Sequence, residues 1–276
     1  MTDNELKRKS VAYRMALLKY IKLANAGHTG GSLSCVDILN VLYNRILNVS
    51  PETADDPGRD RYIQSKGHSV EALYVTLADR GFFPESDLET FYGYGSVYTG
   101  HPTRKVRGVE QNTGGLGHGL AFSVGVALAG HLDKTAYRVF TLVGDGELAE
   151  GSNWESLMAA AHYRLDNLCV IVDRNTLQLT GKTEEICGLE PLAQKLEAFG
   201  GHVRAVNGHD VWALTEVLNI LPFTPGKPSV VIANTIKGKG INFMENHPKW
   251  HHGVPNDKEY EQAQQALSAK LEEMPS

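Results

Sequence analysis

Two polar residues come directly after apolar, β-branched stretches that are typical of strands. Asp145 lies in a Gly-Asp-Gly turn after residues 137–143, and Asn175 follows residues 167–172. A right-handed crossover makes such strands parallel, so both side chains are expected at the carboxyl edge of one sheet, where open α/β folds bind ligands. A carboxylate and an amide oxygen suit Mg²⁺ and leave positions for water and phosphate oxygens. Either residue alone is common in turns, so the joint pattern carries the prediction of a metal and phosphate site.

Four histidines lie in loops, three of them rich in glycine. They are His28 in AGHTGGSLS, His68 in SKGHS, His101 in TGHPT and His252 in NHPKWHHG. Imidazoles donate or accept hydrogen bonds and titrate near neutral pH, so they can orient hydroxyl groups and assist proton transfer. A single loop histidine is usually packed or solvated, and only the set of four favours a functional role.

Composition and charge set the broad class of protein. The chain has 276 residues, of which 42% are hydrophobic and 21% charged, as in a globular protein with a sizeable core. Its formal net charge of -5 gives no electrostatic signature of nucleic-acid binding. The three cysteines form no CxxC pair, which argues against a disulfide framework or a zinc site and fits a reducing cytoplasm.

No targeting or membrane segment is expected. The first 20 residues are charged throughout and lack the apolar stretch of a signal peptide. The apolar segment 121–130 is too short to cross a bilayer. The prediction is therefore a cytoplasmic protein with neither a membrane nor a nucleic acid as partner.

The first half of the chain should be mainly helical around one long loop. Helices are predicted over 4–25, closed by Gly27, over 34–48 with Ser34 as the N-cap, and over 70–79, with a short strand at 61–65. Residues 93–119 are rich in glycine and are expected to form a loop. The helix predicted from 120 to 131 carries many small residues, which indicate close packing such as a subunit contact.

The second half alternates between strands and helices. Strands are predicted at 137–143, 167–172, 202–206 and 229–236, and helices at 152–163, 191–199 and 211–221. This alternation predicts an α/β fold with a mainly parallel sheet and helices on both faces. The final segment, 257–273, is expected to be a polar helix or a loose tail.

The order strand, Gly-Asp-Gly, helix, strand, Asn resembles the thiamine-diphosphate motif of the transketolase-like superfamily. The resemblance implies the thiamine-diphosphate-binding fold. It also implies that the Asp145 and Asn175 side chains and the Leu177 main-chain oxygen bind Mg²⁺, with Ca²⁺ or Mn²⁺ as substitutes. That ion would bridge the diphosphate of the cofactor, thiamine diphosphate.

The glycine-rich segment NTGGLGHGL resembles the run that passes under the thiazolium ring in this family. Gly114, Gly115 and Leu116 would pack their backbone against the cofactor, where a side chain at the glycines would collide. His118 stands where many full-length transketolases carry Gln, which leaves the role of His118 open.

Further residues before and after the predicted crossover also resemble the family. Gly144 and Gly146 belong to the cofactor motif, and Glu150 matches a family glutamate at the subunit contact near the cofactor. By its own context Glu150 is equally a solvated residue before a helix. The segment NTIKGKGINFMENHPKWHHG resembles the corresponding family loop, although Lys237 and Lys239 are predicted to be ordinary surface lysines.

The four histidines are similar to those of transketolases. The resemblance implies that His68 and His252 face the diphosphate, whereas His28 and His101 face the hydroxyls of the ketose donor. His28, His101 and His252 would then handle hydroxyl contacts and proton movements.

The resemblance extends from about His28 to His252 and implies that residues 1–276 form one diphosphate-binding domain. The family's pyrimidine-binding domain supplies a glutamate to the aminopyrimidine ring, and no counterpart follows His252. That domain and the C-terminal domain are expected on a partner, a transketolase C-terminal-half subunit, in an α₂β₂ heterotetramer. The implied reaction transfers a two-carbon ketol unit from a ketose, by default a pentose phosphate, to an aldose.

Three alternatives remain open at this stage. One is the α chain of a 2-oxo-acid dehydrogenase, which usually lacks motifs such as those around His68 and His101. Another is a deoxyxylulose-phosphate synthase, which is normally a longer chain. The third is a non-catalytic orphan subunit, against which the intact set of polar residues argues.

Overall fold

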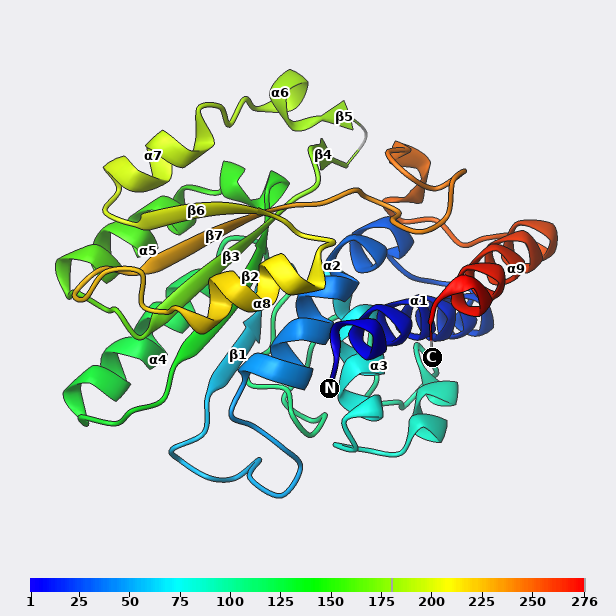
Figure 1. Cartoon of the computed structure of the whole chain (residues 1–276), viewed down its shortest axis with the longest axis horizontal. Helices are drawn as coiled ribbons and strands as arrows, with labels where there is room; N and C mark the ends of the chain where they lie inside the picture. Colours follow the sequence, from blue (N-terminus) through cyan, green and yellow to red (C-terminus); the bar gives the residue numbers. More distant parts are fainter. Residues whose placement is uncertain (180, 276) are drawn as a thin grey trace.

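Five parallel strands form the centre of the molecule in the computed structural model, which describes residues 1–179 and 181–275 (Figure 1). Their order is β1-β2-β3-β7-β6, and each neighbouring pair is parallel. The strands are β1 (Arg61–Gln64), β2 (Val139–Gly144), β3 (Leu168–Arg174), β6 (His202–Asn207) and β7 (Ser229–Asn234). The predicted parallel α/β sheet is confirmed, and β2 and β3 are direct neighbours.

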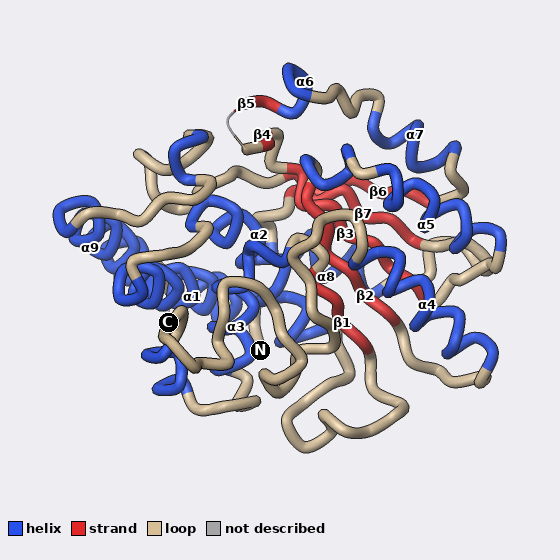
Figure 2. The backbone as a smooth tube through the Cα atoms, turned by 180° about the vertical axis from the view of Figure 1, so that it is seen from behind, coloured by secondary structure: helices blue, strands red, loops and turns tan. Residues whose placement is uncertain are grey.

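Helices cover both faces of this sheet. Figure 1 shows α8 in front of the strands, and Figure 2 shows α4 and α5 over the opposite face. At one end of the sheet, α1 and α3 pack against α2, and α9 packs against α1. The bounds are α1 (Asp3–Ala24), α2 (Thr29–Val41), α3 (Val70–Asp79), α4 (Gly119–Leu132), α5 (Gly151–His162), α7 (Leu192–Ala198), α8 (Val211–Asn219) and α9 (Asp257–Glu273).

Alternating strand residues build two separate apolar cores. Phe140 and Leu142 of β2 face the core shared with α1, α2, α3 and α8, whereas Val139 and Val143 face the core shared with α4, α5 and α7. Successive side chains of a strand point to opposite faces, so a strand buried on both sides is apolar throughout. This explains why each central strand reads as an uninterrupted apolar run.

The start of α2 differs from the prediction. The helix begins at Thr29, so Ser34 lies inside it and is not an N-cap: its hydroxyl donates to Asp173 Oδ2 at 2.6 Å. The early start brings Gly30 against the chain near Trp250, where an added Cβ would lie 2.8 Å from the Trp250 carbonyl oxygen. A π-helical turn, Leu42–Ile46, continues α2 over most of the remaining predicted range.

Other helix ends have similarly local causes. Asn25, with a φ of 50°, takes the left-handed conformation that ends α1, so the predicted closure by Gly27 is wrong. The terminal segment is the helix α9, whose N-cap Asn256 forms a capping box with Glu259. As predicted, residues 93–118 contain neither helix nor strand.

Three short elements after β3 were not predicted. Leu177–Gln178 (β4) pairs antiparallel with Gly181–Lys182 (β5), and the one-turn helix α6 (Thr183–Ile186) follows. Elements of two to four residues are too short to produce a periodic apolar pattern. Within the described part of the chain, no helix has the length and apolar character needed to cross a membrane.

Candidate cofactor site at the carboxyl edge of the sheet

A cavity of about 340 Å³ lies at the carboxyl edge of the sheet. Loops that follow β1, β2, β3 and β7 surround it, together with the start of α2. Its walls are formed by His28, Gly31, Lys66, His68, His101, Gly114, Leu116, Gly144, Asp145, Gly146, Glu147, Glu150, Asn175, Leu177, Gln178, Leu179, Lys237 and His251. All predicted site residues except Gly115 and His252 therefore line one cavity.

The predicted metal ligands lie at the ends of neighbouring strands. Asp145 Oδ1 accepts from the Gly146 N–H at 2.8 Å, and Oδ2 accepts from the Thr176 N–H at 2.6 Å. Asn175 Oδ1 accepts from the Leu177 N–H at 3.2 Å. These bonds order a tight turn that brings the Asp145 carboxylate, the Asn175 amide and Leu177 to the same wall. Burial raises the pKa of Asp145, an effect that a bound cation would oppose.

This set is poor in carboxylates. Among residues 1–179 and 181–275, no group of three or more His, Cys, Asp or Glu side chains could hold a metal ion. Asp145 is the one charged member of the predicted set, and the other ligands are amide and main-chain oxygens. Such a site suits Mg²⁺ only when phosphate oxygens complete the coordination.

Four further histidines surround the ring of His28. Ring centroids lie 4.6 Å away for His252, 5.3 Å for His68, 5.6 Å for His251 and 6.1 Å for His101. Burial, together with the neighbouring histidines, lowers the pKa of His28 to about 3, so its ring is neutral at physiological pH. Burial likewise lowers the pKa of His68 and of His101. The predicted gathering of histidines is thus present in the structure.

His251 was missed by the sequence analysis, which singled out His252. The ring of His251 lines the cavity and its Nδ1 lies 2.9 Å from Lys237 Nζ, whereas His252 is exposed and contacts His28 outside the lining. Burial lowers the pKa of His251 to about 4, so its Nδ1 accepts from the Lys237 ammonium. The two adjacent histidines are visible in the sequence, but the sequence does not tell which of two neighbouring loop residues faces the cavity.

Lys237 is not the surface lysine that its sequence context predicted. Its side chain is buried at 2% exposure, and burial lowers its pKa to about 8. Lys66, also buried, donates to the Gly31 carbonyl oxygen at 2.9 Å and pairs with Asp173. The charge of Lys66 is balanced by Asp173, whereas Lys237 has no carboxylate partner in the ranges that the structure describes and gives this wall its positive charge. Lys239 is half-buried and pairs with Glu245.

Close backbone contacts explain two glycines of the loops. Gly114 has a φ of 132°, and a Cβ there would lie 2.4 Å from His101 Cδ2. A Cβ on Gly67 would lie 2.7 Å from the Gly114 nitrogen. The glycine-rich loop thus passes directly over the residues that carry His68. His118 is exposed outside the cavity, and its side chain makes no capping hydrogen bond to α4.

Glu147 is a second residue that the sequence analysis did not select. Its Oε1 accepts from the Ser65 hydroxyl at 2.5 Å and the Gly117 N–H at 3.0 Å, and its Oε2 accepts from the Gly144 N–H at 3.0 Å. One buried carboxylate therefore joins the ends of β1 and β2 to the glycine-rich loop. Burial raises the pKa of Glu147, while its three donors favour the ionised form.

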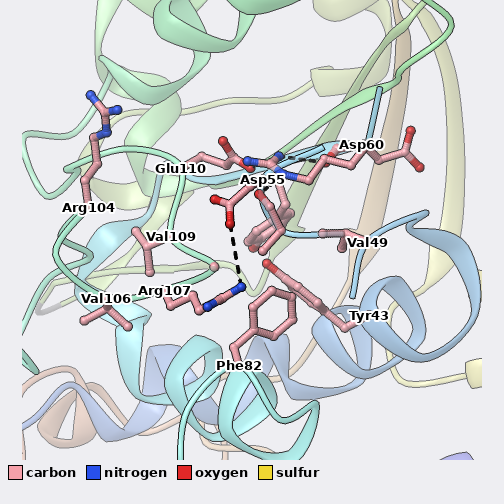
Figure 3. Close-up of a pocket in the computed structure, with 14 residues that line it drawn as sticks. Tyr43, Val49, Asp55, Asp60, Phe82, Arg104, Val106, Arg107, Val109 and Glu110 are labelled. Carbon is pink, nitrogen blue, oxygen red and sulfur yellow. Dashed lines mark hydrogen bonds and ion pairs between the residues drawn. The ribbon is translucent and has the colours of Figure 1, made fainter. Parts of the chain in front are cut away.

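A second cavity, of about 220 Å³, lies beside the start of β1 and has a different character (Figure 3). Arg59 pairs there with Glu110, and Arg107 lies 3.7 Å from Asp55. None of the predicted site residues lines this cavity. Because the predicted site residues gather in the first cavity, that cavity is the better candidate for chemistry.

Comparison with known proteins identifies the class. The family described as "Transketolase, thiamine diphosphate binding domain" matches residues 7–274. The chain belongs to this family. The transketolase of Campylobacter jejuni has a similar structure, with a TM-score of 0.90 and 30% identity over 97% of this chain. This chain covers 43% of that protein, so it spans less than half the length of that transketolase.

Two curated relatives match over almost their whole length. One is a subunit of the apulose-4-phosphate transketolase of Phocaeicola vulgatus, which is 44% identical over 99% of this chain and 98% of that protein. The other is a subunit of the 6-deoxy-6-sulfo-D-fructose transketolase of a Clostridium species, which is 39% identical over 97% of this chain and 96% of that protein.

The position of Glu147 leads to a prediction. Replacing Glu147 with Gln turns an amide N–H₂ toward groups that are themselves donors, which should destabilise the chain by about 1–3 kcal/mol. Urea denaturation should show the loss, and hydrogen exchange should rise in residues 113–119. The exposed Glu197→Gln on α7 is the matched control. Unchanged unfolding of Glu147→Gln would contradict the joining role.

Proposed function

We propose that this chain is the diphosphate-binding subunit of a two-chain transketolase. With thiamine diphosphate and Mg²⁺, the complex would transfer a two-carbon ketol unit from a ketose phosphate to an aldose. The cavity at the carboxyl edge of the sheet carries this proposal, because it combines one hard ligand set, positive charge and neutral histidines. Residues 1–276 form the diphosphate-binding domain in this proposal. The three free cysteines fit a cytoplasmic location.

The residues present fit the cofactor and its metal. Asp145, Asn175 and the Leu177 main-chain oxygen would hold Mg²⁺, and the ammonium groups of Lys66 and Lys237 line the wall where diphosphate charge needs compensation. The buried Nδ1 of His28 lacks a partner among the described residues, as expected of a group that hydrogen-bonds to a ligand. When bound, thiamine diphosphate supplies the electron sink that lets a carbon–carbon bond beside a carbonyl break.

The histidines of this chain would bind and deprotonate sugar hydroxyls. Because His28 and His101 have lowered pKa values, both rings are neutral at physiological pH and can accept a hydrogen bond or a proton. Burial, and after it the Lys237 ammonium, keep His251 neutral, and with Nδ1 accepting from Lys237 its Nε2 is a donor. The cavity thus offers both acceptors and a donor to a polyhydroxylated substrate.

The relatives support a partner chain, because both are named as single subunits of transketolases and match this chain over almost its whole length. The outer face of α4 supports it independently. Ala121, Gly125 and Ala129 lie four residues apart on that face, all are exposed, and Phe122 beside them is 36% exposed. A Cβ added to Gly125 would have no neighbour within 4 Å. Glycine inside a helix costs about 1 kcal/mol, so another chain that approaches this backbone closely would explain it.

The α4 face leads to a prediction about assembly. Gly125→Leu should weaken association with the C-terminal-half subunit, because the larger side chain holds the two backbones apart. Light scattering after size-exclusion chromatography should show the expected α₂β₂ complex for the wild type and separate chains for the variant. The exposed Gln262→Leu on α9 is the matched control. Wild-type assembly of Gly125→Leu would contradict the assigned face.

The function itself is tested by reconstitution. The chain is assayed alone and with a transketolase C-terminal-half chain, with thiamine diphosphate and Mg²⁺. The donors are xylulose 5-phosphate, apulose 4-phosphate and 6-deoxy-6-sulfofructose, and the acceptor is ribose 5-phosphate. Ketol transfer in the mixture alone is expected, because this chain supplies one side of the cofactor site. Activity of the chain alone would contradict the two-chain proposal, and oxidative decarboxylation of a 2-oxo acid would contradict transketolase activity.

A substitution at His101 tests turnover separately from cofactor binding. Its ring lines the cavity and packs against Gly114. His101→Ala in the reconstituted enzyme should lower kcat/KM by about 10²–10⁴-fold if the ring handles protons. Affinity for thiamine diphosphate should stay near that of the wild type, as should the activity of the control His202→Ala, at the amino end of β6. Equal turnover of His101→Ala and wild type would exclude the assigned role.

A further inference from the structure

Arg174, the last residue of β3, contacts three acidic side chains through its guanidinium group. Its side chain is 6% exposed. Nη1 donates to Asp145 Oδ2 at 3.2 Å and to the Thr183 hydroxyl at 2.7 Å. Nη2 donates to Glu184 at 3.0 Å and to Glu190 at 2.9 Å. One guanidinium thus joins a predicted metal ligand to two ends of the segment 183–190.

The segment 183–190 depends on this guanidinium for its charge balance. Glu184 accepts from the Leu189 N–H at 3.1 Å and Glu190 accepts from the Leu192 N–H at 2.9 Å, so both carboxylates are fixed near each other. Together with Asp145 they bring three negative charges around Arg174. Without the guanidinium these carboxylates would repel one another, and the segment would lose its side-chain hydrogen bonds to β3 at Thr183, Glu184 and Glu190.

The same segment is connected to the wall of the cavity. The Thr183 N–H donates to the Thr176 carbonyl oxygen at 3.0 Å, and Thr176 in turn donates its N–H to Asp145. Between them the β4–β5 hairpin packs on the Gly-Asp-Gly turn, where a Cβ on Gly146 would lie 2.9 Å from Gln178 Cγ. The Asp145 carboxylate and residues 183–190 are therefore held by one network.

We infer that Arg174 is a positioning residue that orients Asp145 for the metal and holds residues 183–190 beside it, so that cofactor binding and the ordering of this segment are coupled. The inference rests on the proposed function. Coupling is reciprocal, so a ligand that fixes Asp145 stabilises the segment, and a loosened segment weakens the ligand. The planar fork of Arg matches several carboxylates at once, which the single ammonium of Lys does not.

The coupling is tested with Arg174→Met and Arg174→Lys in the reconstituted complex. Titration with thiamine diphosphate in the presence of Mg²⁺ should show about 10–100-fold weaker binding for Arg174→Met, the usual effect of losing a group that orients a metal ligand. Arg174→Lys should fall between Arg174→Met and the wild type. At saturating cofactor the KM for the sugar donor should be unchanged. The matched control is Arg204→Met, on the exposed part of β6. Wild-type affinity in Arg174→Met would overturn the inference.

Hydrogen exchange of the free chain provides a second readout. Arg174→Met should raise exchange across residues 183–190, with circular dichroism unchanged. Glu184→Gln combined with Glu190→Gln keeps the contacts of Arg174 to Asp145 and Thr183 but removes both ion pairs to the segment. It should also weaken cofactor binding, to a smaller degree than Arg174→Met. Full cofactor affinity in that double variant would overturn the coupling.

Failure of the proposed function is distinguishable from failure of this inference. A wild-type complex that shows no Mg²⁺-dependent binding of thiamine diphosphate contradicts the proposed function and with it the role of Arg174 at the metal. Unchanged exchange of residues 183–190 in Arg174→Met contradicts the attachment of the segment, whatever the complex binds.

Discussion

A buried ion pair between Lys66 and Asp173 holds together the segments that form the cavity. Asp173 also accepts from the hydroxyls of Ser34 and Thr235, and Lys66 donates to the Gly31 carbonyl oxygen, so β1, β3, β7 and α2 meet at one point. Burial opposes both charges, yet the pair raises the pKa of Lys66 and lowers that of Asp173. Removing either partner would leave an uncompensated buried charge, at a cost of about 3–5 kcal/mol.

The Lys66–Asp173 ion pair also influences the charge state of the nearby histidines. Lys66 adds positive charge below His68 and His251 and contributes to lowering the pKa of both, although burial is the larger cause. The imidazoles are therefore neutral, and the positive charge of this wall lies on the buried lysines, of which Lys66 is paired with Asp173 and Lys237 has a pKa lowered to about 8. This division of roles suits a site that must compensate a diphosphate and still leave rings free to exchange protons with a sugar.

The sheet could be predicted from the sequence because the pattern that marks a strand lies within a few neighbouring residues. Apolar runs bounded by polar residues marked the central strands β2, β3 and β7, and Asp145 and Asn175 could be placed at one edge from the strand–helix–strand order and the handedness of the crossover. Contacts between distant segments determine the start of α2, the burial of Lys237 and which of His251 and His252 faces the cavity. Such contacts cannot be read from local patterns in a single sequence. Arg174 and Glu147 went unnoticed for the same reason, since both act through hydrogen bonds made across loops.

The distribution of chemistry within the chain explains why a second chain is required by the proposal. The predicted ligands for the diphosphate and its metal directly follow strands whose order is fixed by the two cores, so this half of the proposed site is preformed. The predicted histidines His28 and His101 line the same cavity, and the proposal assigns the contact to the aminopyrimidine ring to the partner chain. Gly125 remains exposed on α4, and its backbone is open to close approach. A rigid half-site beside an open helix face is the arrangement expected if assembly completes the site.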